Sequence, residues 1–150
     1  MLCEYGYIDT AYKMLRNTKA PGWLAMVKAG ATTIWESYEM YDKEGHPIGH
    51  SMNHYSPGAV CSFLFEKTLG INVEKENRLL IKPIIDRSFT YAAGSYDSPY
   101  GIVKSSWKTD GEKTRFEFEI PANCTARIIL PDGQTEEVET GSYSYVCKLN

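Results

Sequence analysis

The sequence lacks a hydrophobic run long enough to cross a bilayer, since none of its apolar stretches approaches the roughly 20 residues that a membrane helix needs. It also lacks an excess of basic residues: 16 Lys and Arg stand against 19 Asp and Glu, for a net charge of −3. Nucleic acids and anionic membranes bind basic surfaces. We therefore expect neither a nucleic acid nor a membrane as a partner.

Two further absences concern the cellular compartment. The opening residues MLCEYGYIDTAYKML lack the basic start, the apolar centre and the cleavage site of a secretory leader, so we expect a cytoplasmic protein. No two cysteines form a C-x-x-C pair, which argues against zinc ribbons and thioredoxin-like sites. We expect free thiols in a reducing cytosol, and two disulfides in a secreted chain are the alternative. The cysteines are Cys3, Cys61, Cys124 and Cys147.

The composition that remains is typical of a globular protein. Hydrophobic residues make up 43% of the chain and charged residues 23%, while 11 Tyr, 5 Phe and 3 Trp bring the aromatic share to 13%. A length of 150 residues suits one domain, or a small half-domain joined to a small module.

The first half of the chain has helical spacing in three places. Apolar residues recur at intervals of three and four over residues 7–15, and a shorter apolar segment follows over residues 23–30. Residues 41–53 are a polar loop with turn signals. We expect the third helix to begin at an N-cap, Ser56, with Pro57 in its first position, and to end at a glycine, Gly70.

The second half changes to the spacing of strands separated by turns, which predicts an antiparallel sandwich. The expected strands are 79–84, 89–96, 101–107, 114–120, 125–130, 136–138 and 142–148. We place the boundary between the two halves near residue 75. About three helices cannot close a core by themselves, because each must bury its apolar stripe against a partner. We therefore expect residues 1–75 to lack neighbouring helices.

Two clusters in the first half carry chemistry. One is GATTIWE at residues 30–36, where Glu36 follows Trp35, and the other is SMNHY at residues 51–55. A carboxylate among aromatic rings suits a glycosidase, in which a carboxylate holds a water or attacks the sugar while ring faces pack on its C–H surface. A nearby imidazole, such as that of His54, hydrogen-bonds sugar hydroxyls.

Other interpretations of these residues stay open at this level. A lone glutamate is more often a solvated or ion-paired surface residue, and Trp35 equally suits a sugar contact or a packed wall. His50 and His54 have the spacing of a metal pair on a helix, but the loop supplies no third ligand, so we expect no metal and no other cofactor. We expect Glu39 to be structural.

Three stretches closely resemble the C-terminal end of bacterial α-L-rhamnosidases of glycoside hydrolase family 78. They are GATTIWE at 30–36, SMNHYSPGAV at 51–60 and IPANCTARIILPDG at 120–133. With weaker matches before and between these stretches, the resemblance covers essentially the whole chain. It implies an α+β assembly: the last helices of an (α/α)6 barrel over residues 1–75, then a jelly-roll-like antiparallel β-sandwich over residues 76–150.

The resemblance also implies a mechanism and site residues. The family inverts configuration with two carboxylates, and Glu36 matches the general base, whereas the general acid belongs to an upstream motif that this chain lacks. His54 matches a rhamnose contact, and we expect Asn53 and Trp35 to line the same subsite. The partners implied are a rhamnose-containing glycoside and the remainder of the catalytic barrel. The chain alone is then inactive, and its exposed helix faces favour self-association.

A second hypothesis assigns no catalysis to the chain. The strand half is then an accessory module, which either binds carbohydrate or covers the barrel helices as a structural cap.

Overall fold

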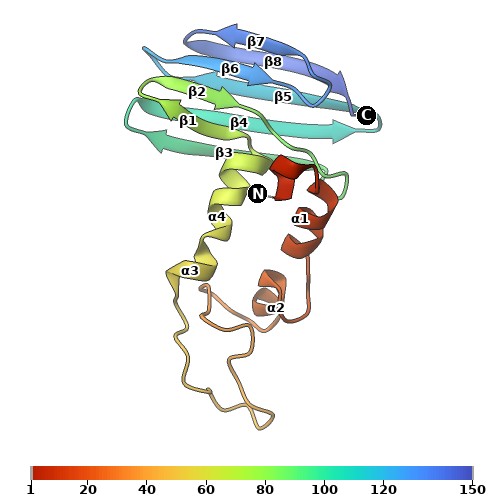
Figure 1. Cartoon of the computed structure of the whole chain (residues 1–150), viewed down its shortest axis with the longest axis vertical. Coiled ribbons are helices and arrows are strands. Elements are labelled where there is room, and N and C mark those ends of the chain that lie inside the picture. Colours follow the sequence, from red (N-terminus) through yellow and green to blue (C-terminus); the bar gives the residue numbers. More distant parts are fainter. Residues whose placement is uncertain (1, 150) are drawn as a thin grey trace. The chain divides into compact units, whose positions relative to one another are not determined.

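The computed structural model describes residues 2–149, and the chain divides into two compact units, Met1–Cys61 and Ser62–Asn150. Figure 1 shows helices and loops in the first unit and mainly strands in the second. No helix within the described residues has the length and apolar character needed to cross a membrane. The domain boundary predicted near residue 75 stays a prediction; β1 begins before it, at Ile71.

The first unit contains short helices separated by irregular chain. A 3-10 turn, η1 (Leu2–Tyr5), precedes α1 (Ile8–Leu15) and α2 (Trp23–Lys28), which confirm the first two predicted helices. Gly30 follows α2 with a φ of +84°, a left-handed conformation that glycine adopts without strain. The predicted loop at 41–53 is confirmed, apart from an isolated bridge between Tyr41 and Pro47.

The third predicted helix is interrupted in the structure. It consists of α3 (Tyr55–Gly58), α4 (Val60–Phe63) and a π-helical turn, η2 (Leu64–Thr68). The N-cap predicted at Ser56 is wrong, because the cap is His54, whose Nδ1 accepts a hydrogen bond from the Ser56 N–H. Pro57 is therefore the third residue of the helix and not the first, a position that still suits proline because the first N–H groups of a helix have no carbonyl partner.

The packed interior of the first unit is small. Its buried cluster comprises Met26, Trp35 and Met40, with Ala31, Ile34 and Tyr38 packed against them. Several large apolar side chains of this unit are exposed: Tyr5, Tyr7, Met14, Val27 and Tyr55. This pattern is the one expected of helices that bury only part of their apolar surface against each other.

The second unit is a sandwich of two four-stranded sheets. One sheet has the order β1-β2-β6-β7, and the other has the order β3-β4-β5-β8. All neighbouring strands are antiparallel except β2 and β6, which are parallel. The strands are β1 (Ile71–Lys75), β2 (Arg78–Ile81), β3 (Tyr91–Ser98), β4 (Gly101–Asp110), β5 (Lys113–Ile120), β6 (Thr125–Ile129), β7 (Thr135–Val138) and β8 (Gly141–Lys148). The predicted sandwich is therefore confirmed.

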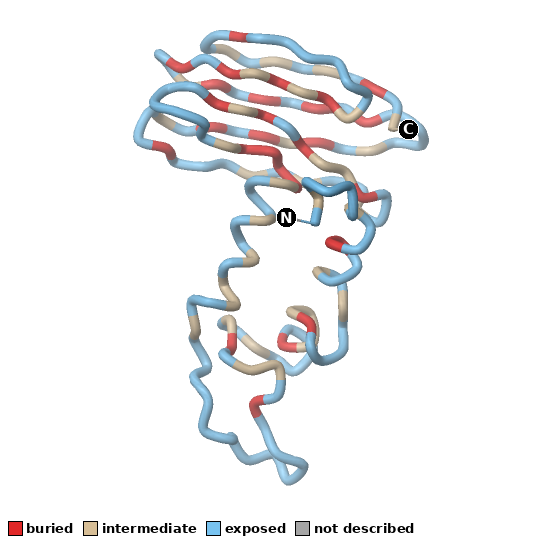
Figure 2. Tube along the Cα trace, in the orientation of Figure 1, coloured by how far each residue is buried: buried red, intermediate tan, exposed pale blue. Residues whose placement is uncertain are grey.

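Alternating side chains build the sandwich core. Along β5 every second residue, from Thr114 to Ile120, is buried, and the residues between them are exposed. Figure 2 shows the same alternation along other strands. Side chains from both sheets form one buried cluster that includes Leu79, Trp107 and Phe116. This burial of one face of each sheet is the main stabilising contribution to the unit.

The end of η2 is fastened to the sheet β3-β4-β5-β8. The Ser105 hydroxyl donates to the carbonyl of Leu69 at 2.6 Å, and the Trp107 indole donates to the carbonyl of Thr68 at 2.8 Å. Both donors lie on β4 and are almost completely buried. The last carbonyls of a helical segment lack intrahelical partners, and these side chains satisfy two of them.

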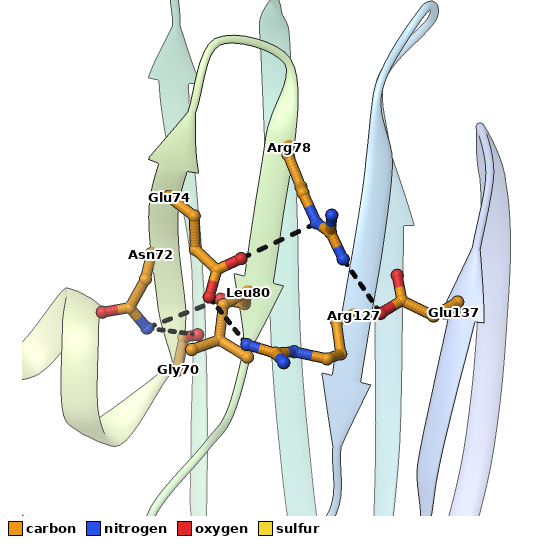
Figure 3. A network of polar contacts seen from close by, with 7 residues as sticks. All are labelled: Gly70, Asn72, Glu74, Arg78, Leu80, Arg127 and Glu137. Carbon is orange, nitrogen blue, oxygen red and sulfur yellow. Dashed lines mark hydrogen bonds and ion pairs between the residues drawn. The ribbon is translucent and has the colours of Figure 1, made fainter.

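The edge strand β1 has no counterpart among the predicted strands, because Ile71 is its only buried residue. Polar contacts on the outer face hold it to its neighbours (Figure 3). Glu74 pairs with Arg127 at 2.8 Å and with Arg78 at 3.8 Å, and Arg78 reaches Glu137 at 3.2 Å. The Asn72 side-chain amide donates to the carbonyls of Gly70, at 2.9 Å, and Leu80, at 3.5 Å.

Candidate functional site

The two clusters singled out in the sequence lie side by side in the first unit. Glu36 and Ser51 are joined twice: the Glu36 N–H donates to the Ser51 carbonyl at 2.9 Å, and the Ser51 N–H donates to Glu36 Oε2 at 2.8 Å. Three residues further, the His54 N–H donates to the Ile34 carbonyl at 2.8 Å. The two loop segments therefore run antiparallel and bring Glu36 and His54 into one site.

The Glu36 carboxylate is exposed and stabilised in its charged form. The hydrogen bond from the Ser51 backbone is the largest influence and lowers its pKa; desolvation acts in the opposite direction, and the imidazoles of His54 and His50 lower the pKa further. Oε1 makes no hydrogen bond within residues 2–149. Glu36 thus presents an ionised oxygen that is able to accept a proton.

His54 has its two ring nitrogens in different roles. Nδ1 accepts the N–H of Ser56 at 3.3 Å, so the neutral ring carries its proton on Nε2. The ring is half-buried and stacks on Tyr55 with centroids 5.3 Å apart and an interplanar angle of 14°. The helix-capping bond therefore orients the imidazole and leaves an Nε2–H donor for a ligand.

Helix α3 is itself tied to α2. The Trp23 indole donates to the carbonyl of Pro57 at 2.9 Å, and its ring meets Tyr38 edge to face at 6.3 Å. This bond holds the first turn of α3, and hence its cap His54, against the preceding helix. Trp23 thus has a structural role in the first unit.

Ser51 has a larger role than the sequence indicated. Its hydroxyl donates to the Asn53 carbonyl at 2.9 Å and accepts the Asn53 N–H at 3.2 Å, while its backbone holds Glu36. One residue therefore shapes the loop and positions the carboxylate. The available signal was the Ser-x-Asn pattern in a polar loop, which is typical of a side chain closing a local turn.

The other two predicted substrate contacts differ in their surroundings. Asn53 is exposed on the loop beside His54. Trp35 is only 4% exposed, packs with Met26 and Met40, and contacts Tyr41 edge to face at 5.8 Å. Trp35 is thus part of the small packed interior of the first unit, and its contact with sugar stays a prediction.

Side chains that could bind a metal ion do not gather in the described part of the chain. Within residues 2–149, no three His, Cys, Asp or Glu side chains come close enough to share one. The exposed Asp42–His46 pair, with 3.2 Å between carboxylate and Nδ1, is a local bond that closes the turn at residues 42–46.

Two family models match successive parts of the chain. Residues 1–68 match the model of the bacterial alpha-L-rhamnosidase six-hairpin glycosidase domain, and residues 77–144 match that of the bacterial alpha-L-rhamnosidase C-terminal domain. Among curated relatives, an alpha-L-rhamnosidase of Formosa agariphila is 35% identical over 97% of this chain. One from Streptomyces avermitilis is 26% identical over 93% of it.

Solved structures show the same fold. The native alpha-L-rhamnosidase of Aspergillus terreus superposes with a TM-score of 0.90 at 31% identity, over 97% of this chain and 18% of its own. The Streptomyces avermitilis alpha-L-rhamnosidase complexed with L-rhamnose superposes with a TM-score of 0.90 at 24% identity, over 98% and 17%. The predicted order, barrel helices followed by a sandwich, is confirmed.

The match covers nearly all of this chain but only a small part of each relative. The chain spans 16% of the Formosa agariphila protein and 14% of the curated Streptomyces avermitilis protein. Both family models that it matches nevertheless come from one kind of enzyme, and together they cover most of its length. The chain belongs to the bacterial α-L-rhamnosidase family, of which it carries part of the six-hairpin domain and the C-terminal domain.

Proposed function

We propose that this chain is part of an inverting α-L-rhamnosidase that removes terminal α-linked rhamnose, and that Glu36 is its general base. The observation that carries the proposal is the Glu36 carboxylate, held ionised by the Ser51 N–H with one oxygen open, beside the oriented imidazole of His54. The name of the 35% identical relative supports rhamnosides as substrates.

In the proposed mechanism Glu36 takes a proton from a water as that water attacks the anomeric carbon. A general acid on the other side of the bond protonates the leaving oxygen, so the sugar inverts. The His54 Nε2–H and the exposed Asn53 amide bind rhamnose hydroxyls, and Trp35 supports the loop and borders the same subsite.

The proposal assigns the general acid and most of the sugar pocket to parts of the enzyme outside these 150 residues. An inverting site needs its two carboxylates roughly 6.5–9.5 Å apart, with the bond between them. With one of the two, the isolated chain is expected to be inactive. Its remaining proposed partner is the rest of the catalytic barrel; the cytoplasmic location also stays a prediction.

The test is hydrolysis of p-nitrophenyl α-L-rhamnoside by a longer protein that contains this chain. We expect Glu36→Gln to lower kcat about 10²–10⁴-fold, the usual contribution of a positioned base. Glu39→Gln is the matched control, since Glu39 is an exposed carboxylate three residues away, and it should keep full activity. In Glu36→Ala, azide should restore turnover by attacking the anomeric carbon in place of the activated water.

Full activity of Glu36→Gln in the longer protein would refute the base assignment. Rhamnose released first as the α-anomer, followed by NMR, would refute inversion. Activity of the 150-residue chain by itself would refute the division of the carboxylates. If the longer protein also fails to hydrolyse the substrate, the result favours the alternative hypothesis. In that hypothesis the sandwich is a carbohydrate-binding or structural accessory module without catalysis.

A further inference from the structure

A groove crosses the face of the sheet β3-β4-β5-β8 that is turned away from the sandwich core. It consists of two adjoining hollows of about 680 and 460 Å³. Both are lined by Ala93, Ser106 and Glu117, so they form one continuous depression. None of these residues belongs to the Glu36 site.

Small side chains explain why this face is hollow. The strand register places Ala93 opposite Ser106, Ser106 opposite Glu117, and Glu117 opposite Ser144. Three of these four neighbours have short side chains, which leaves open space above the sheet. The polar groups that remain along this row are two hydroxyls and the exposed Glu117 carboxylate, which are groups that hydrogen-bond sugar hydroxyls.

The two ends of the groove differ in charge. At one end, Lys104 and Glu119 neutralise each other in an ion pair of 2.8 Å. At the other end, Lys108 and Arg115 lie directly opposite each other in the strand register, and both are exposed. Neither forms an ion pair with a carboxylate within residues 2–149. Like charges directly opposite in a sheet destabilise it, so this end would gain from a bound anion.

An exposed aromatic ring borders the same end. Tyr91 is the register partner of Lys108, lines the smaller hollow and is 69% exposed. An aromatic face beside hydroxyl and carboxylate groups is typical of sugar sites, where the ring packs on C–H groups. The guanidinium of Arg115 adds a planar donor pair that matches a carboxylate.

We propose that this groove binds a short oligosaccharide that carries a carboxylate, with the acid group between Lys108 and Arg115. The adjoining sugar lies over Ser106, Glu117 and Ser144, and Tyr91 packs on the ring that bears the acid. The proposal does not rest on the role of Glu36, because it concerns a binding site on the sandwich and is measured without hydrolysis.

The test is binding of trigalacturonate to the ¹⁵N-labelled 150-residue chain, followed by NMR and calorimetry. Its fully methyl-esterified form is the neutral probe of the same shape. We expect shifts of backbone amides in β3, β4, β5 and β8, and binding of the ester at least about tenfold weaker, the loss of one charge-assisted hydrogen bond. Added salt should weaken the binding of the acid but not that of the ester.

Two double variants with equal changes of charge locate the site. Lys108→Gln with Arg115→Gln should abolish the preference for the acid, whereas Lys43→Gln with Lys75→Gln, which changes two exposed lysines outside the groove, should leave it intact. Tyr91→Ala should weaken the binding of the acid and of the ester to the same extent.

Several outcomes would overturn the proposal. Equal binding of acid and ester would indicate a neutral-glycan site. Tighter binding of a sulfated trisaccharide than of trigalacturonate would show that Lys108 and Arg115 recognise sulfate and not carboxylate. Amide shifts confined to residues outside these strands would show that trigalacturonate does not bind in the groove. The absence of any shift at millimolar trigalacturonate, in 10-fold excess over the protein, would show the same.

Discussion

Two buried side chains of β4, Ser105 and Trp107, are expected to stabilise the sandwich through the end of η2. Ser105 is 1% exposed and donates to the Leu69 carbonyl at 2.6 Å. Ser105→Ala removes this donor and leaves the carbonyl of a buried residue without it. We expect a loss of about 1–3 kcal/mol in the free energy of unfolding, the cost of a buried polar group that loses its partner.

Trp107→Phe tests the second bond. Trp107 is 2% exposed, and its indole donates to the Thr68 carbonyl at 2.8 Å. Phenylalanine keeps an aromatic ring but has no N–H, and its smaller ring leaves part of the indole's space unfilled. We therefore expect a loss at least as large as that of Ser105→Ala.

The assay is urea unfolding of the 150-residue chain, followed by the circular dichroism of its β-structure. Ser106→Ala is the matched control, because Ser106 lies next to Ser105 on the opposite face of β4 and is half-buried. We expect this control to change stability by no more than about 0.5 kcal/mol, with an unchanged dependence on urea. Equal losses for Ser105→Ala and Ser106→Ala would refute the reasoning.

Two further predictions concern a glycine and the carboxylate of the site. Gly70 and Gly111 both have positive φ, +76° and +59°, but an added Cβ at Gly70 would lie 2.7 Å from the Cα of Pro83, whereas one at Gly111 would meet nothing within 4 Å. Gly111→Ala should therefore cost about 1–2 kcal/mol for its conformation alone, and Gly70→Ala clearly more, in the same urea assay; equal costs would contradict the role of the clash. Glu36 should titrate below the ordinary pKa of a glutamate when its side-chain carboxyl carbon is followed by NMR, and Ser51→Pro, which removes the donating N–H, should raise that pKa. The Ser51 bond then contributes to stability above the ordinary glutamate pKa and is lost as the pH falls through the lowered one, so an unchanged pKa in the variant would show that the bond is unimportant.

Local patterns predicted most of the regular elements. The strand over residues 113–120 has strong periodicity because one side of it faces the packed sandwich interior, and the helix over residues 8–15 has a strong apolar stripe, of which Ala11 and Tyr12 are buried. The edge strand β1 has only one buried residue, so it carries no alternation that a sequence could show. A serine before a proline is the commoner cap signal, so the local pattern favours Ser56 over the observed cap, His54.

The candidate site was predictable in its members but not in its arrangement. The stretches at residues 30–36 and 51–60 marked Glu36 and His54 through resemblance to a family. Nothing in a polar loop indicates which backbone groups will pair across 15 residues, so the bonds of Ser51 to Glu36 could not be read from spacing. The burial of Trp35 was likewise undecided, since an aromatic residue suits both a wall and a sugar contact.

The sequence by itself determined the order of helices and strands, the two-part organisation and the family, because these depend on periodicity, turn residues and motifs that act locally. The tertiary structure alone decided which oxygen of Glu36 is held, which nitrogen of His54 is available, and that Lys108 and Arg115 stand side by side on one sheet. The Glu36 bond joins two loop segments 15 residues apart, the His54 bond depends on where α3 begins, and the Lys108–Arg115 pair depends on the register of the β4–β5 hairpin. Such pairings are selected by the packing of the whole unit, which no local pattern encodes.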